Sequence, residues 1–563
     1  MMELNAVAQP PSTAAPRPPT GVVYTRDRLP ASEWIKLGSL VKVPAREKPL
    51  TVEEILAFLS DRPRFRRILF IAPRPHGYDV PPAPTPSFGY LGEAISGHGF
   101  EWRLLDLRLG GGLNEVRAAI REFRPDVIGY TFQFTIGAKR CMEFLHQIRR
   151  ATDLPIVIGG AHLTIRGHNI LEEAPKVLAA VQKEGEYPLL AILKGVPLER
   201  IPNLWIRQGN LVIETPLLGY VGELDSLPWP RYPGYDLERF AHVGQVDVLT
   251  SRGCPFLCTF CSVALTQGRR FRTRTPENVV QELRYWYDRG IRLFNFIDDI
   301  LTVNKSRFHE VLDRIRRERF EGVTFSCTQG MRADACDLEM LEKMKDVGFE
   351  FLGFGVESGS ERMLRTIKKG ETLDEIDAAI SNACKVGFEV GLFFIIGMPN
   401  ETAEDVEKSF AFAFRHPVMY ARFHACVPYP GTELAAWVDA NSTWYVRPEV
   451  YLNDFSYHDG QIVFDCKGMS LSEHRRYLRR AYAVDAEVRR LYAVERMVRN
   501  GTPRIIASPA SRVFYNPLYF NKLRRFVATN KLGASIKNVV SRVFNLQTRA
   551  HTGMAAITFN SGK

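Results

Sequence analysis

The stretch Arg252-Gly253-Cys254-Pro255-Phe256-Leu257-Cys258-Thr259-Phe260-Cys261 decides how the rest of this chain is interpreted. Its three cysteines, Cys254, Cys258 and Cys261, lie within eight residues. Thiolates are the preferred protein ligands of iron–sulfur clusters, and a cubane takes one ligand for each iron. Three cysteines therefore hold three irons of a [4Fe–4S] cluster and leave the fourth iron open to a substrate or cofactor. The spacing predicts such an open cluster, with these cysteines as metal ligands and catalytic residues.

A zinc site is the alternative for the same cysteines. A closed structural zinc site takes four nitrogen or sulfur ligands. The nearest further candidates are His242 and Cys327, and neither stands at a customary spacing from the triplet. The other six cysteines show no ligand spacing and are expected to be ordinary thiols.

The residues on either side of the triplet predict a strand, a loop and a helix. Residues 245–250 alternate in polarity and are rich in β-forming residues, as in a strand. Thr275-Pro276 is typical of a helix start, and Val279 and Leu283 lie on one face of the helix that is expected to follow. The cysteines thus follow the carboxyl end of a strand, where parallel β/α folds gather their chemistry.

Length and composition indicate a multi-domain enzyme of ordinary globular character. The chain has 563 residues, 45% of them hydrophobic and 24% charged, and a formal net charge of +11. Nine cysteines without a secretory leader indicate a reducing compartment. No apolar run approaches the roughly 18 residues of a membrane span. A cytoplasmic location is therefore expected.

Strands and helices alternate in the N-terminal part, which predicts a parallel, doubly wound α/β sheet of the flavodoxin or Rossmann kind. We expect this domain over residues 66–200, after a disordered Pro-rich tail and one short helix over 1–65. A Pro-rich linker with a hairpin is predicted over 201–240. Six strand-like segments over 241–445 predict a partial (β/α)6 barrel of the TIM type, and 446–563 is expected to be a basic helical region.

The cysteine spacing, with an aromatic residue before the last cysteine, resembles the radical S-adenosylmethionine (SAM) enzymes. The resemblance implies that the open iron binds SAM, that one electron cleaves it to a 5′-deoxyadenosyl radical, and that Phe260 lies against the adenine. Residues 294–299, 354–359 and 392–399 resemble the second, fourth and fifth strands of that family's barrel. SAM contacts are implied for three residues of these segments: Glu357, Ser358 and Gly397.

Two features of these segments leave alternatives open. The family often carries a glutamate three residues beyond the glycine of the fifth strand, whereas this chain has Asn400 there and Glu401 one residue later. Asp298 and Asp299 follow the second strand, from where their side chains would reach SAM or substrate. An acidic pair also suits the N-terminus of a helix, which favours negative charge.

The N-terminal domain resembles the cobalamin-binding domain that often precedes a radical SAM barrel. Residues 124–129 and 157–162 match its third and fourth strands, and 183–186 match an acidic turn near its end. The histidine motif that binds cobalt in the cobalamin mutases is missing, so a bound cobalamin is expected to lack a histidine on its lower face. A flavodoxin-like domain without cobalamin is the alternative.

The same resemblance implies where cobalamin binds. Loops at 73–78, 131–135 and 159–164 would frame the corrin and its nucleotide tail, because small residues and backbone groups permit close approach of a large ring. The implied binding residues are Thr131, Gly159 and Gly160.

The C-terminal region carries the strongest charge bias of the chain. From Lys467 to Lys563 there are 19 Lys and Arg against 4 Asp and Glu. The pattern predicts an amphipathic helix that packs its apolar face on the barrel, with contact to an anionic membrane surface as the alternative. A second basic and apolar stretch follows over 513–526. The apolar positions at helical spacing are Leu478, Ala481, Tyr482, Val488, Leu491, Tyr492 and Val498.

The resemblance to both families implies methylation of an unactivated carbon. SAM would supply the methyl group to cobalamin, and a second SAM would supply the radical that opens the substrate carbon. The implied partners are a small-molecule or lipid substrate and a flavodoxin- or ferredoxin-type electron donor. Radical oxidation or cyclisation without methyl transfer is the alternative within the same class.

Two other classes of protein remain as alternatives. A methylthiotransferase acting on tRNA has a similar barrel but adds three N-terminal cysteines, whereas this chain has only Cys141 before Cys254. A nucleic-acid substrate is therefore not expected. A non-catalytic corrinoid-binding protein would need no cysteine triplet.

Overall fold

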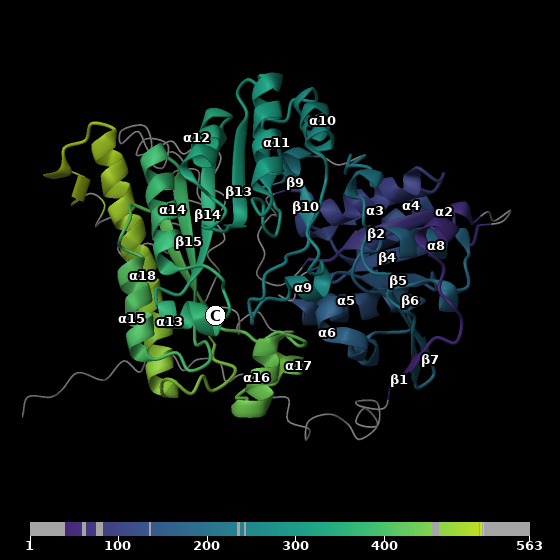
Figure 1. The fold of residues 1–563 in the computed structure, drawn as a ribbon. Helices are drawn as coiled ribbons and strands as arrows, with labels where there is room; N and C mark the ends of the chain where they lie inside the picture. The colour runs from purple at the N-terminus through teal and green to yellow at the C-terminus, as the bar shows by residue number, and fades with distance from the viewer. Residues whose placement is uncertain are drawn as a thin grey trace, which may run out of the picture.

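Two α/β domains lie side by side in the computed structural model, and a long C-terminal helix lies on the far side of the second domain (Figure 1). The predicted Pro-rich tail, parts of two predicted corrin loops and the stretch 513–526 lie outside the described residues. The structure describes residues 40–511, apart from 59–62, 75–82, 134–136, 234–236, 241–243, 453–460, 506 and 509–510.

Eight strands form the N-terminal sheet, in the order β1-β8-β7-β6-β5-β4-β2-β3. Strands β2 to β6 run parallel, as predicted, whereas β7 pairs antiparallel with both β6 and β8. The predicted hairpin thus adds two strands to this sheet, and β8 pairs with β1, a strand that was not predicted. The strands are β1 Val41–Pro44, β2 Arg67–Ala72, β3 Glu101–Asp106, β4 Val127–Thr131, β5 Ile156–Gly159, β6 Ala179–Val181, β7 Leu204–Gln208 and β8 Leu211–Glu214.

Helices cover both faces of this sheet because successive residues of β2 point to opposite sides. Ile68 and Phe70 pack with α3 and α8 in one core, and Leu69 and Ile71 pack with α4 and α5 in the other. This arrangement confirms the predicted doubly wound fold. The helices are α2 Val52–Ala57, α3 Pro86–Ser96, α4 Leu113–Phe123, α5 Ala138–Ala151, α6 Ala161–Arg166, α7 Ile170–Glu173 and α8 Glu186–Lys194.

Six parallel strands form the second sheet, in the order β16-β15-β14-β13-β12-β9. Six parallel strands with helices between them confirm the predicted partial barrel. A short antiparallel pair, β10 Ser251–Arg252 and β11 Arg272–Thr273, frames the cysteine loop. The barrel strands are β9 Gln245–Val248, β12 Leu293–Phe296, β13 Thr324–Met331, β14 Phe349–Glu357, β15 Glu389–Ile396 and β16 Tyr420–Ala425.

The barrel helices pack their apolar faces on the strands in one large core. As predicted, a helix starts after Thr275, whose hydroxyl accepts a hydrogen bond from the backbone of Asn278. The helices are α9 Val263–Thr266, α10 Pro276–Tyr287, α11 Lys305–Glu318, α12 Leu338–Asp346, α13 Glu361–Thr366, α14 Leu373–Val386, α15 Ala403–Phe412, α16 Glu433–Asn441 and α17 Pro448–Tyr451.

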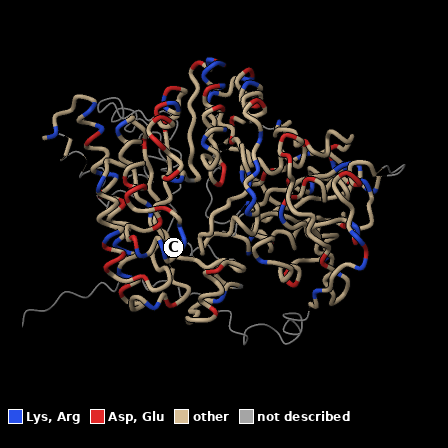
Figure 2. The backbone as a smooth tube through the Cα atoms, in the orientation of Figure 1, with Lys and Arg blue, Asp and Glu red and all other residues tan. Residues whose placement is uncertain are grey.

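The last helix, α18 Leu471–Arg499, packs on β16 and α15. Leu478, Ala481 and Val488 are buried in the barrel core, as predicted for an amphipathic helix packed on the barrel. Two of the predicted apolar contacts are wrong, because Tyr482 and Leu491 are 54% and 41% exposed. Tyr482 and Leu491 therefore lie beside the buried face of α18 that Leu478, Ala481 and Val488 form, and do not belong to it. Figure 2 shows basic residues interspersed with acidic ones over both domains.

Candidate active site

The cysteine loop follows β10 and is tied by its backbone to three separate segments. The amide of Cys254 donates to the carbonyl of Gly268 at 3.0 Å. The amide of Thr259 donates to the carbonyl of Ile367 at 2.9 Å, and its own carbonyl accepts from the amide of Leu434 at 2.9 Å. The three cysteines therefore sit on a loop whose path is fixed by the residues that follow α9 and α13 and by the start of α16.

The three thiols of the loop lie close enough for their charges to interact. Burial raises the pKa of all three. Burial, together with the charges of Cys258 and Cys254, raises the pKa of Cys261 to about 12. Two neighbouring cations, Lys369 and Arg332, lower the pKa of Cys258 and Cys254 in opposition to burial. Positive charge beside a thiol favours the thiolate, which is the form that binds metal.

Those two cations are held in place by carboxylates and by the loop itself. The Nζ atom of Lys369 is buried and lies 3.2 Å from Glu357 and 3.4 Å from Glu371. The guanidinium of Arg332 lies over the ring of Phe256, 3.5 Å from its centroid, and donates to the carbonyl of Lys369 at 2.8 Å. Glu357, a predicted SAM residue, is thus an ion-pair partner beside the cysteine loop.

The other predicted SAM residues have different surroundings. Ser358 is fully buried, and its hydroxyl lies 3.3 Å from that of Ser409 on α15, so its contacts give no support to a SAM contact. Gly397 has φ +95° and packs against His474 of α18. Phe260 is partly buried against the barrel core. The structure therefore brings Glu357 to the cysteine loop, of which Phe260 is a part, whereas Ser358 contacts α15 and Gly397 contacts α18.

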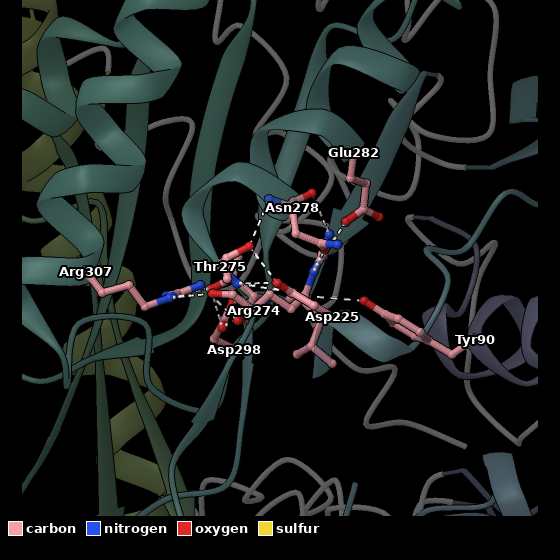
Figure 3. Close-up of polar contacts among 10 residues, drawn as sticks. Tyr90, Asp225, Arg274, Thr275, Asn278, Glu282, Asp298 and Arg307 are labelled. Atoms are coloured by element: carbon pink, nitrogen blue, oxygen red, sulfur yellow. Dashed lines mark hydrogen bonds and ion pairs between the residues drawn. The ribbon is translucent and has the colours of Figure 1, made fainter. Parts of the chain in front are cut away.

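A buried polar network fixes the segment that leads into the loop (Figure 3). Asp298 accepts hydrogen bonds from the amide of Thr250 at 3.1 Å, from its hydroxyl at 2.9 Å, and from the hydroxyl of Ser251. Arg307 donates to the carbonyl of Thr250 at 3.0 Å. The alternative of a helix N-terminus at the acidic pair is wrong, because the next helix, α11, begins at Lys305.

A cavity of about 470 Å³ lies between the carboxyl ends of the two parallel sheets. Thr131, Gly159 and Gly160, the three residues predicted to bind cobalamin, line it from the N-terminal domain. Arg252 and Asp299 line it from the barrel. Burial raises the pKa of Asp299 to about 6. The strand ends of both domains therefore line one common cavity.

The cavity wall leaves backbone exposed where a side chain would not fit. Gly160 has φ +113°, and a Cβ there would stand 2.5 Å from the carbonyl oxygen of Phe132. Phe88, Leu91 and Leu189 supply an apolar surface. Among the described residues that line the cavity, none is a histidine. Bare backbone beside an apolar wall suits the close approach of a large, flat ring.

Buried ion pairs join the two domains beside the cavity, and the sequence alone did not reveal them. Arg252 lies 3.2 Å from Glu184 and 2.9 Å from Glu186, and Arg272 lies 2.8 Å from Glu184. Burial by itself lowers the pKa of Arg252, but Glu186 and Glu184 outweigh it, so the pKa is raised. The acidic turn was the only signal in the sequence, and nothing in it identified the arginines as partners.

Comparison with known proteins agrees with this geometry. The chain matches the model of the Radical SAM superfamily over residues 248–413 and that of the B12 binding domain over 80–193. An uncharacterized methyltransferase of Pyrococcus horikoshii is 32% identical over 395 residues, which cover 62% of this chain and 85% of the relative. The chain belongs to the cobalamin-binding group of the radical SAM superfamily.

This radical SAM enzyme has further relatives with other names. It is 25% identical to the anaerobic magnesium-protoporphyrin IX monomethyl ester cyclase of Rubrivivax gelatinosus, over 65% of this chain and 69% of the cyclase. Among solved structures, it resembles the radical SAM methyltransferase TsrM of Kitasatospora setae, solved with cobalamin and a [4Fe–4S] cluster bound. The TM-score is 0.59 at 18% identity, and the match covers 67% of this chain and 75% of TsrM. That likeness shows a shared fold.

The two matched domains of this radical SAM enzyme imply a [4Fe–4S] cluster, SAM and cobalamin as cofactors. The loop fits a cluster, because its three thiols interact and have two cations beside them. The cavity fits a corrin, because its glycine wall exposes backbone.

The described residues lack two further features. They contain no group of three His, Cys, Asp or Glu side chains arranged to hold a metal ion. A cubane differs from a single ion because each of its cysteines binds a separate iron. No helix in the described part of the chain is long and apolar enough to cross a bilayer.

Proposed function

We propose that this enzyme transfers a methyl group to an unactivated carbon of a small molecule. The observation that carries the proposal is the cavity lined by strand ends of both cofactor domains. When bound, the cluster and SAM supply a hydrogen-abstracting radical, and cobalamin supplies the methyl group. A single cavity between the domains would allow both to act on one substrate.

Residues of this chain would hold the cofactors and exclude solvent. Cys254, Cys258 and Cys261 would ligate the cluster, on a loop whose backbone is tied to three neighbouring segments. Thr131, Gly159 and Gly160 would offer small side chains and backbone groups to the corrin. The apolar walls of the cavity would keep water from the reacting carbon.

The relatives support the proposal and also supply its competitor. The Pyrococcus horikoshii relative and TsrM are both named methyltransferases. The Rubrivivax gelatinosus relative is a cyclase, which favours radical cyclisation without methyl transfer as the second candidate. The two candidates share the cluster and the cavity, so product analysis separates them.

The test is anaerobic reconstitution of the full chain with iron, sulfide and hydroxocobalamin, followed by incubation with methyl-labelled SAM and candidate acceptors. Methyl transfer is expected to yield 5′-deoxyadenosine, S-adenosylhomocysteine and a labelled acceptor. Formation of 5′-deoxyadenosine alone, with a modified but unlabelled acceptor, would favour the cyclase candidate. Cys258→Ala should abolish SAM cleavage, whereas Cys384→Ala, outside the loop, should preserve it. SAM cleavage by Cys258→Ala would overturn the cluster assignment.

Three partners complete the proposal: a flavodoxin- or ferredoxin-type electron donor, a lipid as a further substrate class, and an anionic membrane surface. The membrane contact would use Arg475, Arg476 and Arg479, which are exposed on α18. Deleting 467–563 would remove a helix from the barrel core, so changing these three arginines to glutamate is the cleaner test. Unchanged sedimentation with anionic liposomes would remove the membrane from the proposal.

A further inference from the structure

The acidic turn between β6 and α8 contacts the cavity and the barrel at the same time. Glu184, Gly185 and Glu186 all line the cavity. The side chains of Glu184 and Glu186 are 7% and 5% exposed, and both pair with Arg252 of the other domain. A ligand that moves this turn therefore also moves a buried ion pair.

Arg252 connects the acidic turn to the cluster loop. It stands two residues before Cys254, and its guanidinium also lies 4.9 Å from the ring centroid of Tyr90 in α3. These three contacts of its head group, with Glu184, Glu186 and Tyr90, thus come from the N-terminal domain. The start of the cysteine loop is consequently positioned by the domain that lines the opposite side of the cavity.

Arg252 and Arg272 face each other across the β10–β11 pair. Like charges directly opposite in an antiparallel pair repel. The carboxylate of Glu184 compensates both, at 3.2 Å and 2.8 Å, and its other oxygen accepts from the amide of Val221 at 2.6 Å. Displacing Glu184 would leave buried Arg272 without its carboxylate and Arg252 with Glu186 alone, which is strongly unfavourable. The frame of the cysteine loop therefore depends on the place of the acidic turn.

We propose that Glu184 and Glu186 are positioning residues that couple cobalamin binding to the cluster loop through Arg252 and Arg272. The inference rests on the proposed function, because it takes both cofactors as bound. A corrin seated against the turn fixes the two arginines and hence Cys254. Coupling between two binding sites is reciprocal, so cobalamin and the SAM-bound cluster would raise each other's affinity by the same factor. A loop that holds cluster and SAM therefore fixes the turn and tightens cobalamin binding.

The test measures the Kd of hydroxocobalamin for the full chain, without its cluster and then with reconstituted cluster and SAM. In the unaltered protein, cluster and SAM are expected to tighten binding by about fivefold or more. Glu186→Gln should reduce that factor to near one. Glu93→Gln should keep it, because Glu93 pairs with Arg231 at 3.9 Å and does not line the cavity.

A spectroscopic readout and a second pair of variants guard against a purely structural effect. Hydroxocobalamin should change the paramagnetic resonance spectrum of the reduced, SAM-bound cluster in the unaltered protein and not in Glu186→Gln. Arg252→Lys keeps a charge within reach of both carboxylates and should retain more coupling than Arg252→Met. Equal coupling in these two variants would overturn the proposal.

The outcomes separate this inference from the proposed function. Protein that binds both cofactors and couples them, but transfers no methyl group, overturns the proposed function alone. Methyl transfer by protein whose Kd for hydroxocobalamin is the same without the cluster as with cluster and SAM overturns the coupling alone. Full coupling in Glu186→Gln does so as well. Protein that binds no hydroxocobalamin overturns both.

Discussion

The imidazole of His474 fills the space that any side chain larger than hydrogen at Gly397 would need. A Cβ at this position would overlap the Cε1 and Nε2 atoms of the ring, and Gly397 has φ +95°. His474 belongs to α18, and Gly397 directly follows the last residue of β15. The C-terminal helix therefore packs directly on a strand end of the barrel, and only glycine permits that contact.

Gly397→Ala is expected to lower the free energy of unfolding by about 3 kcal/mol or more, because it combines backbone strain with a steric clash. The matched control is Gly387→Ala. Gly387 has φ +96° with nothing near its Cβ position, so it measures the strain alone, about 1–2 kcal/mol. Denaturant unfolding of both variants tests this prediction. An equal decrease in the free energy of unfolding of both variants would show that His474 can move away from the new Cβ without destabilising the protein.

The buried carboxyl of Glu401 should make stability depend on pH. Burial raises its pKa to about 8, although the amides of Gly397 and Met398 oppose the shift. The native state therefore holds a proton that the unfolded state has lost, and stability falls as pH rises from about 4.5 to 8. The loss should reach about 4 kcal/mol.

Glu401→Gln mimics the protonated carboxyl and should remove this part of the pH slope. Glu404→Gln, a change on the exposed side of α15, should leave the slope unaltered. The pH dependence of stability in the two variants is measured as denaturant midpoints across this pH range. A slope that is the same in Glu401→Gln and in the unaltered protein contradicts the prediction.

Asp298→Asn should destabilise the barrel by about 3–5 kcal/mol. The amide NH2 group would face the donors of Thr250 and Ser251, and buried Arg307 would lose the carboxylate that most favours its charge. Hydrogen exchange should also rise at the segment before Cys254. Asp225→Asn is the control. Asp225 accepts a hydrogen bond from the amide of Thr275 at an exposed site (Figure 3). Asp225→Asn should therefore lower the free energy of unfolding by less than about 1 kcal/mol. Similar losses in the two variants would refute the structural role of Asp298.

Lys369→Met should destabilise the enzyme by about 3 kcal/mol, because it leaves Glu357 and Glu371 without their shared cation. It should also shift the reduction potential of the reconstituted cluster to a more negative value, since nearby charge tunes that potential. Lys368→Met is the neighbouring control, where the exposed pair with Glu433 contributes under about 1 kcal/mol. Redox titration followed by paramagnetic resonance, together with unfolding, tests both effects. A potential that is the same in both variants would exclude the electrostatic effect.

Gly160→Ala should weaken hydroxocobalamin binding by about tenfold or more. The new Cβ would press on the carbonyl of Phe132 and displace the cavity wall. Gly167→Ala serves as control, because φ there is +71° with open space around the Cβ position. Spectrophotometric titration of the two variants gives the comparison. Equal affinities would argue against a corrin at the Gly160 wall.

Several parts of the fold could be predicted because their signals are local. The cysteine spacing, the alternation of buried strands with helices, and the helix start at Thr275 each depend on residues within one short segment. The three predicted cobalamin residues reach one cavity because they stand at carboxyl ends of neighbouring parallel strands. Whether they contact a corrin stays a prediction.

Other features could not be predicted because they depend on which faces meet. The hydroxyl of Ser358 lies 3.3 Å from that of Ser409, 51 residues further along the chain, and its predicted SAM contact stays a prediction. Strand β1 pairs with β8 across more than a hundred residues of intervening chain. The local sequence does not indicate such partners, since a buried polar group or a strand edge can form its hydrogen bonds with many different groups.

The sequence by itself predicted a cluster at the cysteine triplet and determined the order of the two α/β domains, because spacing and periodicity act over a few residues. Only the tertiary structure decided that Glu184 and Glu186 compensate Arg252 and Arg272, and that both domains close on one cavity. The physical reason is that burying a charge is costly unless its partner arrives from elsewhere in the fold, and packing alone selects that partner.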